Sequence, residues 1–241
     1  MSDAILTLSG VSADIDQYHI LHGVDLEVPA GELTVLLGRN GAGKSTTLRT
    51  IMGLTTVTAG EVRFRGEPIT SQPTPRIARQ GIAFVPESMG IFSMLTVREN
   101  MVLAAVSGRL DEQRLNWIFD LFPPIKKFWD RPAGNLSGGQ KQMLAIARAV
   151  IEPRELLLVD EPTKGLAPAI INDLADAFEQ LKSQNVSILL VEQNFNFSRR
   201  LGQSVAVMSD GKIVHRGSMA DLADNEEQQH ELLGLGLGEH Q

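Results

Sequence analysis

One segment constrains the fold of this 241-residue chain more than any other. It reads Gly38-Arg39-Asn40-Gly41-Ala42-Gly43-Lys44-Ser45 and fits the pattern G-x-x-x-x-G-K-[ST]. An apolar segment, 33–37, precedes it, and a helix-like segment, 45–52, follows. Glycines allow backbone amides to turn toward phosphate oxygens, and the N-terminus of a helix adds partial positive charge. The sequence therefore predicts a strand–loop–helix unit that cradles the phosphates of a nucleotide.

Two side chains of this loop have distinct expected roles. Lys44 would bring a full positive charge to the β- and γ-phosphates, and Ser45 would offer its hydroxyl to Mg²⁺. We therefore expect ATP and Mg²⁺ as cofactors. The expected nucleotide contacts of the loop are Gly38, Arg39, Asn40, Gly41, Ala42, Gly43, Lys44, Ser45 and Thr46.

An acidic pair, Asp160-Glu161, follows the apolar segment 156–159. Open α/β sheets bind ligands at the carboxyl ends of their strands, so this pair belongs near the phosphate loop. Adjacent residues of a strand point in opposite directions, so the two acids should have different roles. We expect Asp160 to support the magnesium ion and Glu161 to act as the general base that activates water.

The rest of the pattern predicts an α/β fold with a mixed sheet. The apolar runs 156–159 and 186–191 are typical of parallel strands covered on both faces. Short turns at 29–32 and 65–66 in the β-rich first third predict antiparallel strands. The middle is helical, with a capping box at Thr96 and Glu99 and a helix expected at 97–107. A further helix should begin near Gly138 and end before Pro153.

Composition excludes several classes of protein. The net charge of −7 argues against general nucleic-acid binding, and the absence of cysteine excludes disulfides and thiolate metal sites. No apolar run approaches the ~20 residues of a membrane-spanning helix, and residues 1–7 do not have the form of a secretory signal. Any link to a membrane would therefore run through a partner protein.

The pentapeptide Leu136-Ser137-Gly138-Gly139-Gln140 lies between the phosphate loop and the acidic pair. With this signature in that order, the sequence resembles the ABC ATPase family over essentially its whole length. The resemblance implies a P-loop NTPase with a RecA-like core, an N-terminal antiparallel β subdomain and an inserted helical subdomain. It also implies that the signature binds ATP in trans, on the phosphate loop of a second subunit. The residues that would do so are Ser137, Gly138, Gly139 and Gln140.

Other family segments are matched with departures. Glu87 stands where the family usually has the glutamine of its Q-loop, and it could still contact the metal. Gln193 stands in place of the switch histidine; its amide can donate to the γ-phosphate but cannot carry an extra proton. With Glu161 and Lys44 it completes the expected catalytic set. The aromatic that stacks on adenine is replaced: either Ile15 packs on the base, or the loop shifts and Tyr18 does.

Three segments narrow the resemblance: Val85-Pro86-Glu87, Gly165-Leu166-Ala167-Pro168 and Val191-Glu192-Gln193-Asn194. Together they resemble the second ATPase subunit of branched-chain amino-acid importers, a group whose relatives serve urea or short-chain amides. The resemblance implies a peripheral protein on the cytoplasmic face of the inner (plasma) membrane. Its expected partners are a second ATPase subunit (sister or self), two permeases and, indirectly, a solute-binding protein. The alternatives are the ATPase of an exporter and a soluble ABC ATPase acting on DNA or ribosomes.

The expected organisation is one ABC ATPase domain over 1–241, with a nucleotide-binding core formed by 1–87 and 151–241. Segment 88–150 would be the helical subdomain that carries the signature. By resemblance, the apolar loop 88–95 and the start of the following helix receive the permease; packing within the subdomain's own core is the other reading. The tail 233–238 alternates leucine and glycine, and we expect a loose end or a docking tail there.

Overall fold

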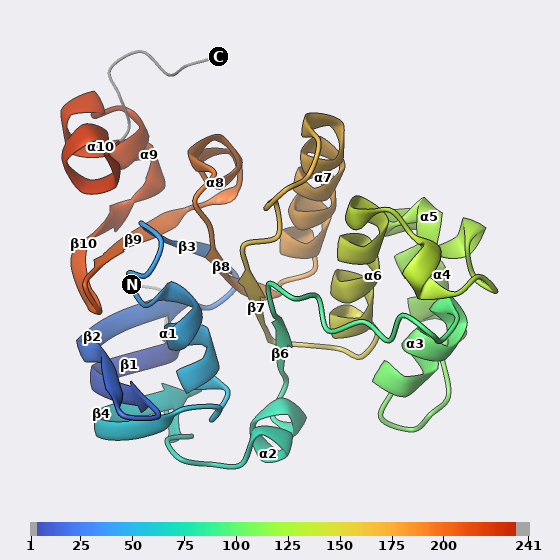
Figure 1. Cartoon of the computed structure of the whole chain (residues 1–241), viewed down its shortest axis with the longest axis horizontal. Helices are drawn as coiled ribbons and strands as arrows, with labels where there is room; N and C mark the ends of the chain where they lie inside the picture. Colours follow the sequence, from blue (N-terminus) through green and yellow to red (C-terminus); the bar gives the residue numbers. More distant parts are fainter. Residues whose placement is uncertain (1–3, 235–241) are drawn as a thin grey trace.

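Among residues 4–234, which the computed structural model describes, the strands form two sheets (Figure 1). The larger sheet has the order β10-β9-β3-β8-β7-β6, and the smaller has the order β2-β1-β4-β5. The strands of the larger sheet are β3 (Leu33–Gly38), β6 (Ile82–Val85), β7 (Leu156–Asp160), β8 (Ser187–Val191), β9 (Ser204–Ser209) and β10 (Lys212–Ser218). Those of the smaller sheet are β1 (Ala4–Ile15), β2 (Tyr18–Pro29), β4 (Thr56–Phe64) and β5 (Glu67–Pro68).

The centre of the larger sheet is parallel. β3 pairs in parallel with β8 and β9, and β7 pairs in parallel with β6 and β8, whereas β10 closes the edge as the antiparallel partner of β9. Every residue of β3, β7 and β8 is buried, as their continuous apolar runs predict. The carboxyl ends of β3, β7 and β8 therefore meet at one edge of the sheet.

The turn at 29–32 does not build a hairpin, and the prediction of antiparallel strands there was wrong. It carries the chain from β2 in the smaller sheet to β3 in the larger one. The physical reason is burial: β3 is covered on both faces and takes β8 and β9 as neighbours, so no edge remains for β2. The turn at 65–66 does join antiparallel strands, β4 and β5.

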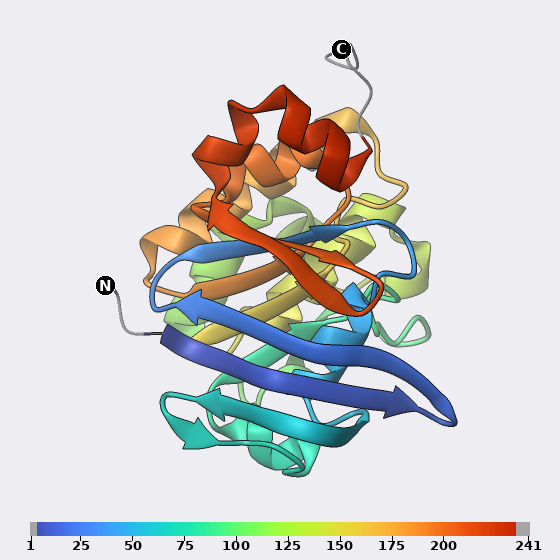
Figure 2. The same ribbon diagram turned by 90° about the vertical axis from the view of Figure 1, so that its left-hand side faces the viewer.

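Ten α-helices surround the sheets within residues 4–234. In Figure 2 the long strands β1 and β2 cross in front of the larger sheet, and in Figure 1 α1 lies beside β1 and β2. The buried side chains of α1 share one hydrophobic cluster with both sheets. The helices are α1 (Lys44–Ile51), α2 (Thr74–Arg79), α3 (Val97–Ala104), α4 (Glu112–Leu121), α5 (Pro123–Lys127), α6 (Gly138–Val150), α7 (Pro168–Ser183), α8 (Phe195–Leu201), α9 (Met219–Ala223) and α10 (Glu226–Leu233).

Helices α3 to α6 gather on one side of the molecule (Figure 1). The expected capping box is present, since Thr96 with Glu99 begins α3, and a second one, Ser137 with Gln140, begins α6. α3 ends at Ala104, three residues before the expected end of that helix. These helices share one hydrophobic cluster with α7 and one face of the larger sheet. The division into a core and a helical subdomain at 88–150 stays a prediction.

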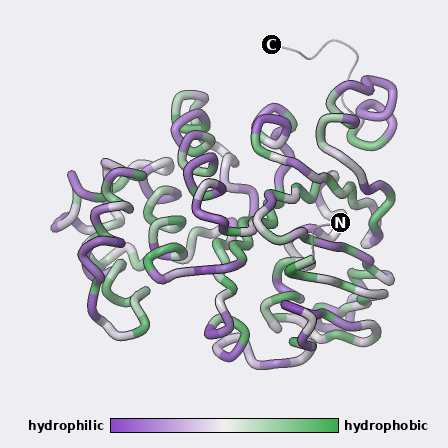
Figure 3. The backbone as a smooth tube through the Cα atoms, turned by 180° about the vertical axis from the view of Figure 1, so that it is seen from behind, coloured by the Kyte–Doolittle hydropathy of each residue, from purple (hydrophilic) through white to green (hydrophobic). Residues whose placement is uncertain are grey.

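Hydropathy follows this layering. Figure 3 shows hydrophobic positions running through the strands at the centre, while both colours alternate along the outer helices. No helix within residues 4–234 is both long enough and apolar enough to cross a membrane. The part of the tail beyond Gly234, on which we expected a docking segment or loose end, lies outside the described residues.

Candidate functional site

The phosphate loop leaves β3 at Gly38 and enters α1 at Lys44, as the motif predicts. Gly38 adopts a φ of 153°, and a Cβ there would lie 2.3 Å from the carbonyl oxygen of Met208. Only glycine fits so close to a neighbouring backbone. The amide of Gly211, in the β9–β10 turn, donates to the carbonyl of Ala42 at 2.9 Å. The loop is thus fixed against β9 on one side and the hairpin turn on the other.

Lys44 is almost fully buried, at 4% exposure. Its Nζ donates to the carbonyl oxygens of Gly38 at 2.9 Å and Arg39 at 3.1 Å. The same ammonium lies 3.3 Å from Glu161 Oε1. A buried charge needs such partners, because burial without them costs several kcal/mol. The side chain is therefore held across the mouth of the loop, where a phosphate group would find a positive charge already in place.

Asp160 ends β7 directly beside the start of α1. Its Oδ1 accepts a hydrogen bond of 2.9 Å from Ser45 Oγ. Burial raises the pKa of Asp160 above its ordinary value, and the Ser45 hydrogen bond only partly offsets that rise. The two oxygens stand where the sequence predicts the magnesium site. Within residues 4–234, no cluster of three or more His, Asp or Glu side chains could hold a metal without other ligands.

The Ser45 hydroxyl and the Asp160 carboxylate fit Mg²⁺ as part of a donor set that a nucleotide would share. Mg²⁺ usually keeps several waters and is bound through one or two carboxylates together with the phosphates of a substrate. Ser45 and Asp160 supply a hydroxyl and a carboxylate next to the phosphate loop. The donor set is incomplete by itself, and a nucleotide would complete it.

Glu161 contacts Lys44 and Gln193, whereas Asp160 contacts Ser45, so the two neighbouring acids have different partners, as expected. Its backbone has a φ of 45°, in the left-handed region that glutamate seldom adopts. Its amide donates to the carbonyl of Val191 at 2.9 Å, which ties it to the end of β8. Burial acts to raise the pKa of Glu161, but the hydrogen bond from Gln193 and the charge of Lys44 outweigh it, so the pKa is lowered. The carboxylate is therefore ionised at neutral pH, as a general base must be.

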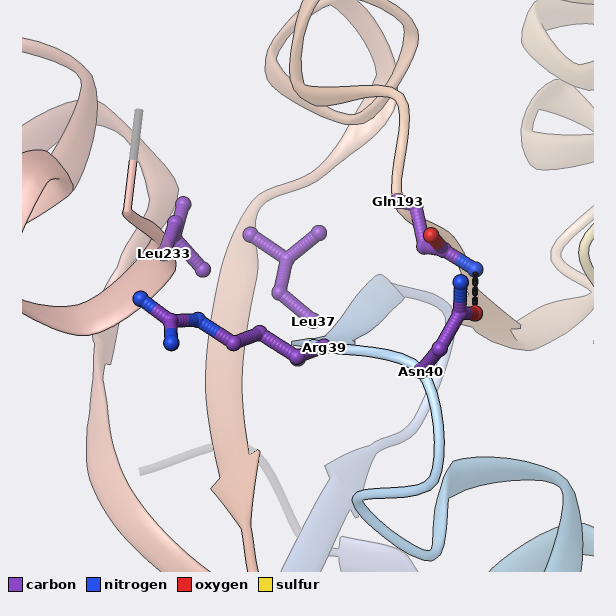
Figure 4. A pocket seen from close by; sticks show the side chains of 6 residues that line it. Leu37, Arg39, Asn40, Gln193 and Leu233 are labelled. Atoms are coloured by element: carbon purple, nitrogen blue, oxygen red, sulfur yellow. Dashed lines mark hydrogen bonds between the residues drawn. The ribbon is translucent and has the colours of Figure 1, made fainter. Parts of the chain in front are cut away.

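Gln193 follows β8 and reaches both Glu161 and the phosphate loop. Its Nε2 donates to Glu161 Oε1 and to Asn40 Oδ1, each at 2.6 Å. Figure 4 shows the bond between Gln193 and Asn40 beside a pocket that also includes Arg39 and Leu233. The Arg39 side chain extends toward Leu233, at the end of α10. One amide nitrogen thus joins the ends of β7 and β8 to the loop after β3.

A second pocket, of about 320 Å³, contains eight of the predicted site residues. They are six of the predicted contacts in segment 38–46, together with Glu87, which follows β6, and Glu161. The pocket also contains two residues that sequence reasoning did not select, Ile20 and Lys164. The residues that line it are Ile20, Asn40, Gly41, Gly43, Lys44, Ser45, Thr46, Glu87, Glu161 and Lys164.

The two candidates for the adenine contact face each other across a hairpin. Ile15 and Tyr18 are paired partners on either side of the turn between β1 and β2. Tyr18 is 64% exposed, and Ile15 is half-buried. The apolar residue of this region that lines the pocket is Ile20, on β2. Its signal in the sequence was an isoleucine two residues beyond Tyr18, too weak to select it.

The signature residues lie outside this group. Ser137 and Gln140 cap the start of α6, where Ser137 Oγ accepts from the Gln140 amide at 3.3 Å. A Cβ on Gly139 would lie 2.5 Å from Ile170 Cγ2, whereas one on Gly138 would meet only Leu166 Cδ2 at 3.7 Å. The described pockets beside the phosphate loop include no residue of 136–140. A single chain therefore does not bring its signature to its own phosphate loop.

A buried glutamate, Glu192, links the two chain segments that carry Glu161 and Gln193. Glu192 is 2% exposed, and its carboxylate accepts from the amides of Thr163 at 3.0 Å, Gln193 at 2.9 Å and Asn194 at 3.1 Å. Burial raises its pKa above the ordinary value. It holds the segment after Glu161 against the segment after β8. An acid directly after the apolar run 186–191 was the available signal, the same pattern that selected Asp160.

Known proteins resemble this chain over nearly its whole length. The ABC transporter family model matches residues 21–164. The high-affinity branched-chain amino acid transport ATP-binding protein BraG of Pseudomonas aeruginosa is 39% identical over 95% of this chain and 100% of its own length. The probable branched-chain amino acid transport ATP-binding protein LivF of Archaeoglobus fulgidus is 35% identical over 93% of this chain and 97% of its own. A nucleotide-free ATP-binding cassette from an ABC transporter shares the fold, with a TM-score of 0.82 over 97% of this chain at 24% identity.

Proposed function

The chain belongs to the ABC transporter family of ATP-binding cassettes, and from that membership we propose that it powers the uptake of branched-chain amino acids or a related small polar solute. As a member of that family it binds and hydrolyses ATP. What we add is the role of each residue, the partners and the solute.

One observation carries the assignment of roles: Ser45 Oγ bonds Asp160 Oδ1 while Lys44 Nζ and Gln193 Nε2 both contact Glu161 Oε1. The loop amides and Lys44 bind the β- and γ-phosphates. Ser45 and Asp160 would hold Mg²⁺, and Glu87, which lines the same pocket as Ser45, would lie near it. Bound there, Mg²⁺ would neutralise charge that develops on the phosphates during hydrolysis.

The residues of the chain then perform the proton chemistry. Glu161, ionised and facing the loop, orients a water molecule and takes its proton. Gln193 fixes that carboxylate and donates toward the γ-phosphate when its bond to Asn40 opens. Glu192 holds both segments in register through its three backbone hydrogen bonds.

A second subunit completes the site. Since residues 136–140 do not line the phosphate-loop pocket of their own chain, they bind ATP held by a partner. The Ser137 amide donates to Gln140 Oε1, and α6 begins at Gly138, where the partial positive charge of a helix N-terminus suits an anion. That partner is a sister cassette or a second copy of this chain.

The loop after β6 is the surface that meets the permeases. The Asn100 side chain holds this loop in place: its Nδ2 donates to the carbonyl oxygen of Phe92 at 3.0 Å. Phe92 is 50% exposed and Met94 is 92% exposed, whereas Met89 and Ile91 pack on the core. The loop thus divides its apolar side chains between its own core and the surface, which supports docking of a membrane partner. The chain would act on the cytoplasmic face of the inner membrane, together with two permeases and a solute-binding protein.

The solute follows from similarity to proteins whose names specify branched-chain amino acid transport. The test is reconstitution. The chain is co-expressed with two permeases, with and without a sister cassette, and the complex is placed in liposomes with a solute-binding protein. ATP-dependent accumulation of leucine, abolished by Glu161→Gln, supports the proposal. ATPase activity that responds to another solute, or efflux in place of uptake, would overturn the solute or the direction.

A further inference from the structure

The nucleotide pocket contains a second lysine that the phosphate loop does not explain. Lys164 follows β7, and its Nζ lies 2.6 Å from Glu87 Oε1 and 3.6 Å from Glu161 Oε2. One ammonium group therefore connects the carboxylate after β6 with the carboxylate after β7. Lys164 and both carboxylates line the same pocket as Lys44.

This end of the pocket is rich in negative charge before any nucleotide enters. Glu87, Asp160 and Glu161 bring three carboxylates to it, and the charges of both glutamates act to raise the pKa of Asp160. The Lys44 ammonium donates to two carbonyl oxygens of the phosphate loop and forms an ion pair with Glu161. Within the described residues Lys44 makes no hydrogen bond to Glu87, which accepts one from Lys164.

The negative charge of Glu87 affects nucleotide binding, because the phosphates of a nucleotide would bind beside it. A carboxylate at the rim of a phosphate pocket repels a nucleoside triphosphate, and partial exclusion of water strengthens that repulsion. A cation paired with the carboxylate cancels it locally. The Glu87–Lys164 pair is about half exposed, with side-chain exposures of 46% and 57%. Such a pair adds little to the stability of the fold, so its effect is on the local charge of the pocket.

We infer that Lys164 is the charge partner of Glu87: it neutralises this carboxylate and holds it at the rim, so that a nucleoside triphosphate can bind next to it. The inference rests on the proposed nucleotide site. Lys164 is a positioning residue, since it acts through Glu87. The contribution of Lys164 to nucleotide affinity therefore depends on the charge of Glu87. Once residue 87 is uncharged, Lys164 becomes dispensable for nucleotide binding.

A double-mutant cycle tests this dependence in the full chain. Wild type, Lys164→Ala, Glu87→Gln and the double variant are titrated with AMP-PNP by calorimetry, first in EDTA and then in Mg²⁺. We expect Lys164→Ala to weaken binding about 2- to 5-fold in EDTA, as for loss of one partly exposed charge pair. The double variant should bind within about twofold of Glu87→Gln alone. Lys164→Arg, which keeps the charge, should bind like wild type.

Two controls separate the possible failures. Lys127→Ala removes an exposed lysine on α5, outside the pocket, and should leave affinity unchanged. Lys44→Ala should abolish binding and so reports on the nucleotide site itself; wild-type affinity in that variant would overturn the proposed site. Wild-type affinity in Lys164→Ala and Lys164→Gln, or an equal loss from Lys164→Ala with and without Glu87, would overturn the charge partnership and leave the nucleotide site intact.

Discussion

The Nε2 atom of Gln193 bonds Glu161 Oε1 and Asn40 Oδ1 at the same distance, 2.6 Å. Both hydrogens of the amide nitrogen are used, one for the candidate base and one for the phosphate loop. A nucleotide that displaces Asn40 frees one hydrogen for the γ-phosphate while the other still holds Glu161. The glutamine can therefore sense the nucleotide without releasing the base.

Gln193→Ala should lower kcat for ATP hydrolysis roughly 10- to 100-fold, the range expected for loss of a hydrogen bond to a charged group. Gln193→His restores a ring N–H donor at this place and should recover most of the rate. Steady-state phosphate release measures both. Wild-type turnover in Gln193→Ala would show that this amide does not position Glu161.

Glu161→Gln should keep nucleotide affinity and lose turnover about 10²- to 10⁴-fold, because an amide cannot take a proton from water. Equilibrium binding of ATP and phosphate release are measured on the same preparation. Glu179→Gln, on the exposed face of α7, is the matched control and should behave like wild type. Full hydrolysis by Glu161→Gln contradicts its role as the base.

Removal of divalent cations with EDTA should stop hydrolysis, and Asp160→Asn should raise the Mg²⁺ concentration that gives half-maximal rate. The reason is that Asp160 and Ser45 are the side chains placed to hold the ion at the phosphate loop. Titration of ATPase activity with MgCl₂ measures this shift. Asp176→Asn, which changes an exposed acid on α7, should not move the midpoint; an unshifted midpoint in Asp160→Asn would contradict the assignment.

Gly139→Ala should destabilise the chain by about 1–3 kcal/mol, since the added methyl group would overlap Ile170 on α7. Gly138→Ala provides the comparison at the neighbouring position, where only an ordinary contact with Leu166 arises. Urea unfolding of the two variants gives the difference. Equal stability would mean that α6 and α7 can separate at no cost.

Glu192 should make stability depend on pH. Burial raises its pKa in the folded chain, so the folded state holds this proton more tightly than the unfolded state. Its contribution to stability is then greatest below the ordinary glutamate pKa, and it falls as pH rises from about 4 through the raised pKa. In Glu192→Gln the amide does not titrate in this pH range. The stability of wild type relative to this variant should therefore decline with rising pH in urea unfolding; a constant difference would contradict the buried titration.

The sequence predicted those parts of the fold that local patterns encode. The phosphate loop, the buried strands β7 and β8 and the capping box at Thr96 rest on residues near each other in the chain, and the structure has all of them. The turn at 29–32 misled because a short connection constrains direction only when its strands share a sheet. Burial of β3 on both faces, a long-range effect, decided otherwise.

The candidate site shows the same division. Lys44, Ser45, Asp160 and Glu161 could be selected because each follows a recognisable pattern, and the structure brings them together. Lys164 could not, since its importance comes from facing Glu87 across 77 residues of sequence. Ile20 likewise gains its place only from the packing of β2 beside the phosphate loop.

The backbone of Glu161, with its φ of 45°, has a consequence for how this chain can evolve. A glutamate held in the left-handed region costs about 1–3 kcal/mol, and glycine would remove that cost. Selection for a sturdier chain alone would therefore favour glycine at 161, while selection for turnover keeps the acid. Lineages in which this cassette has ceased to hydrolyse ATP should lose Glu161 early, and laboratory selection for thermostability without a growth requirement should find the same substitution.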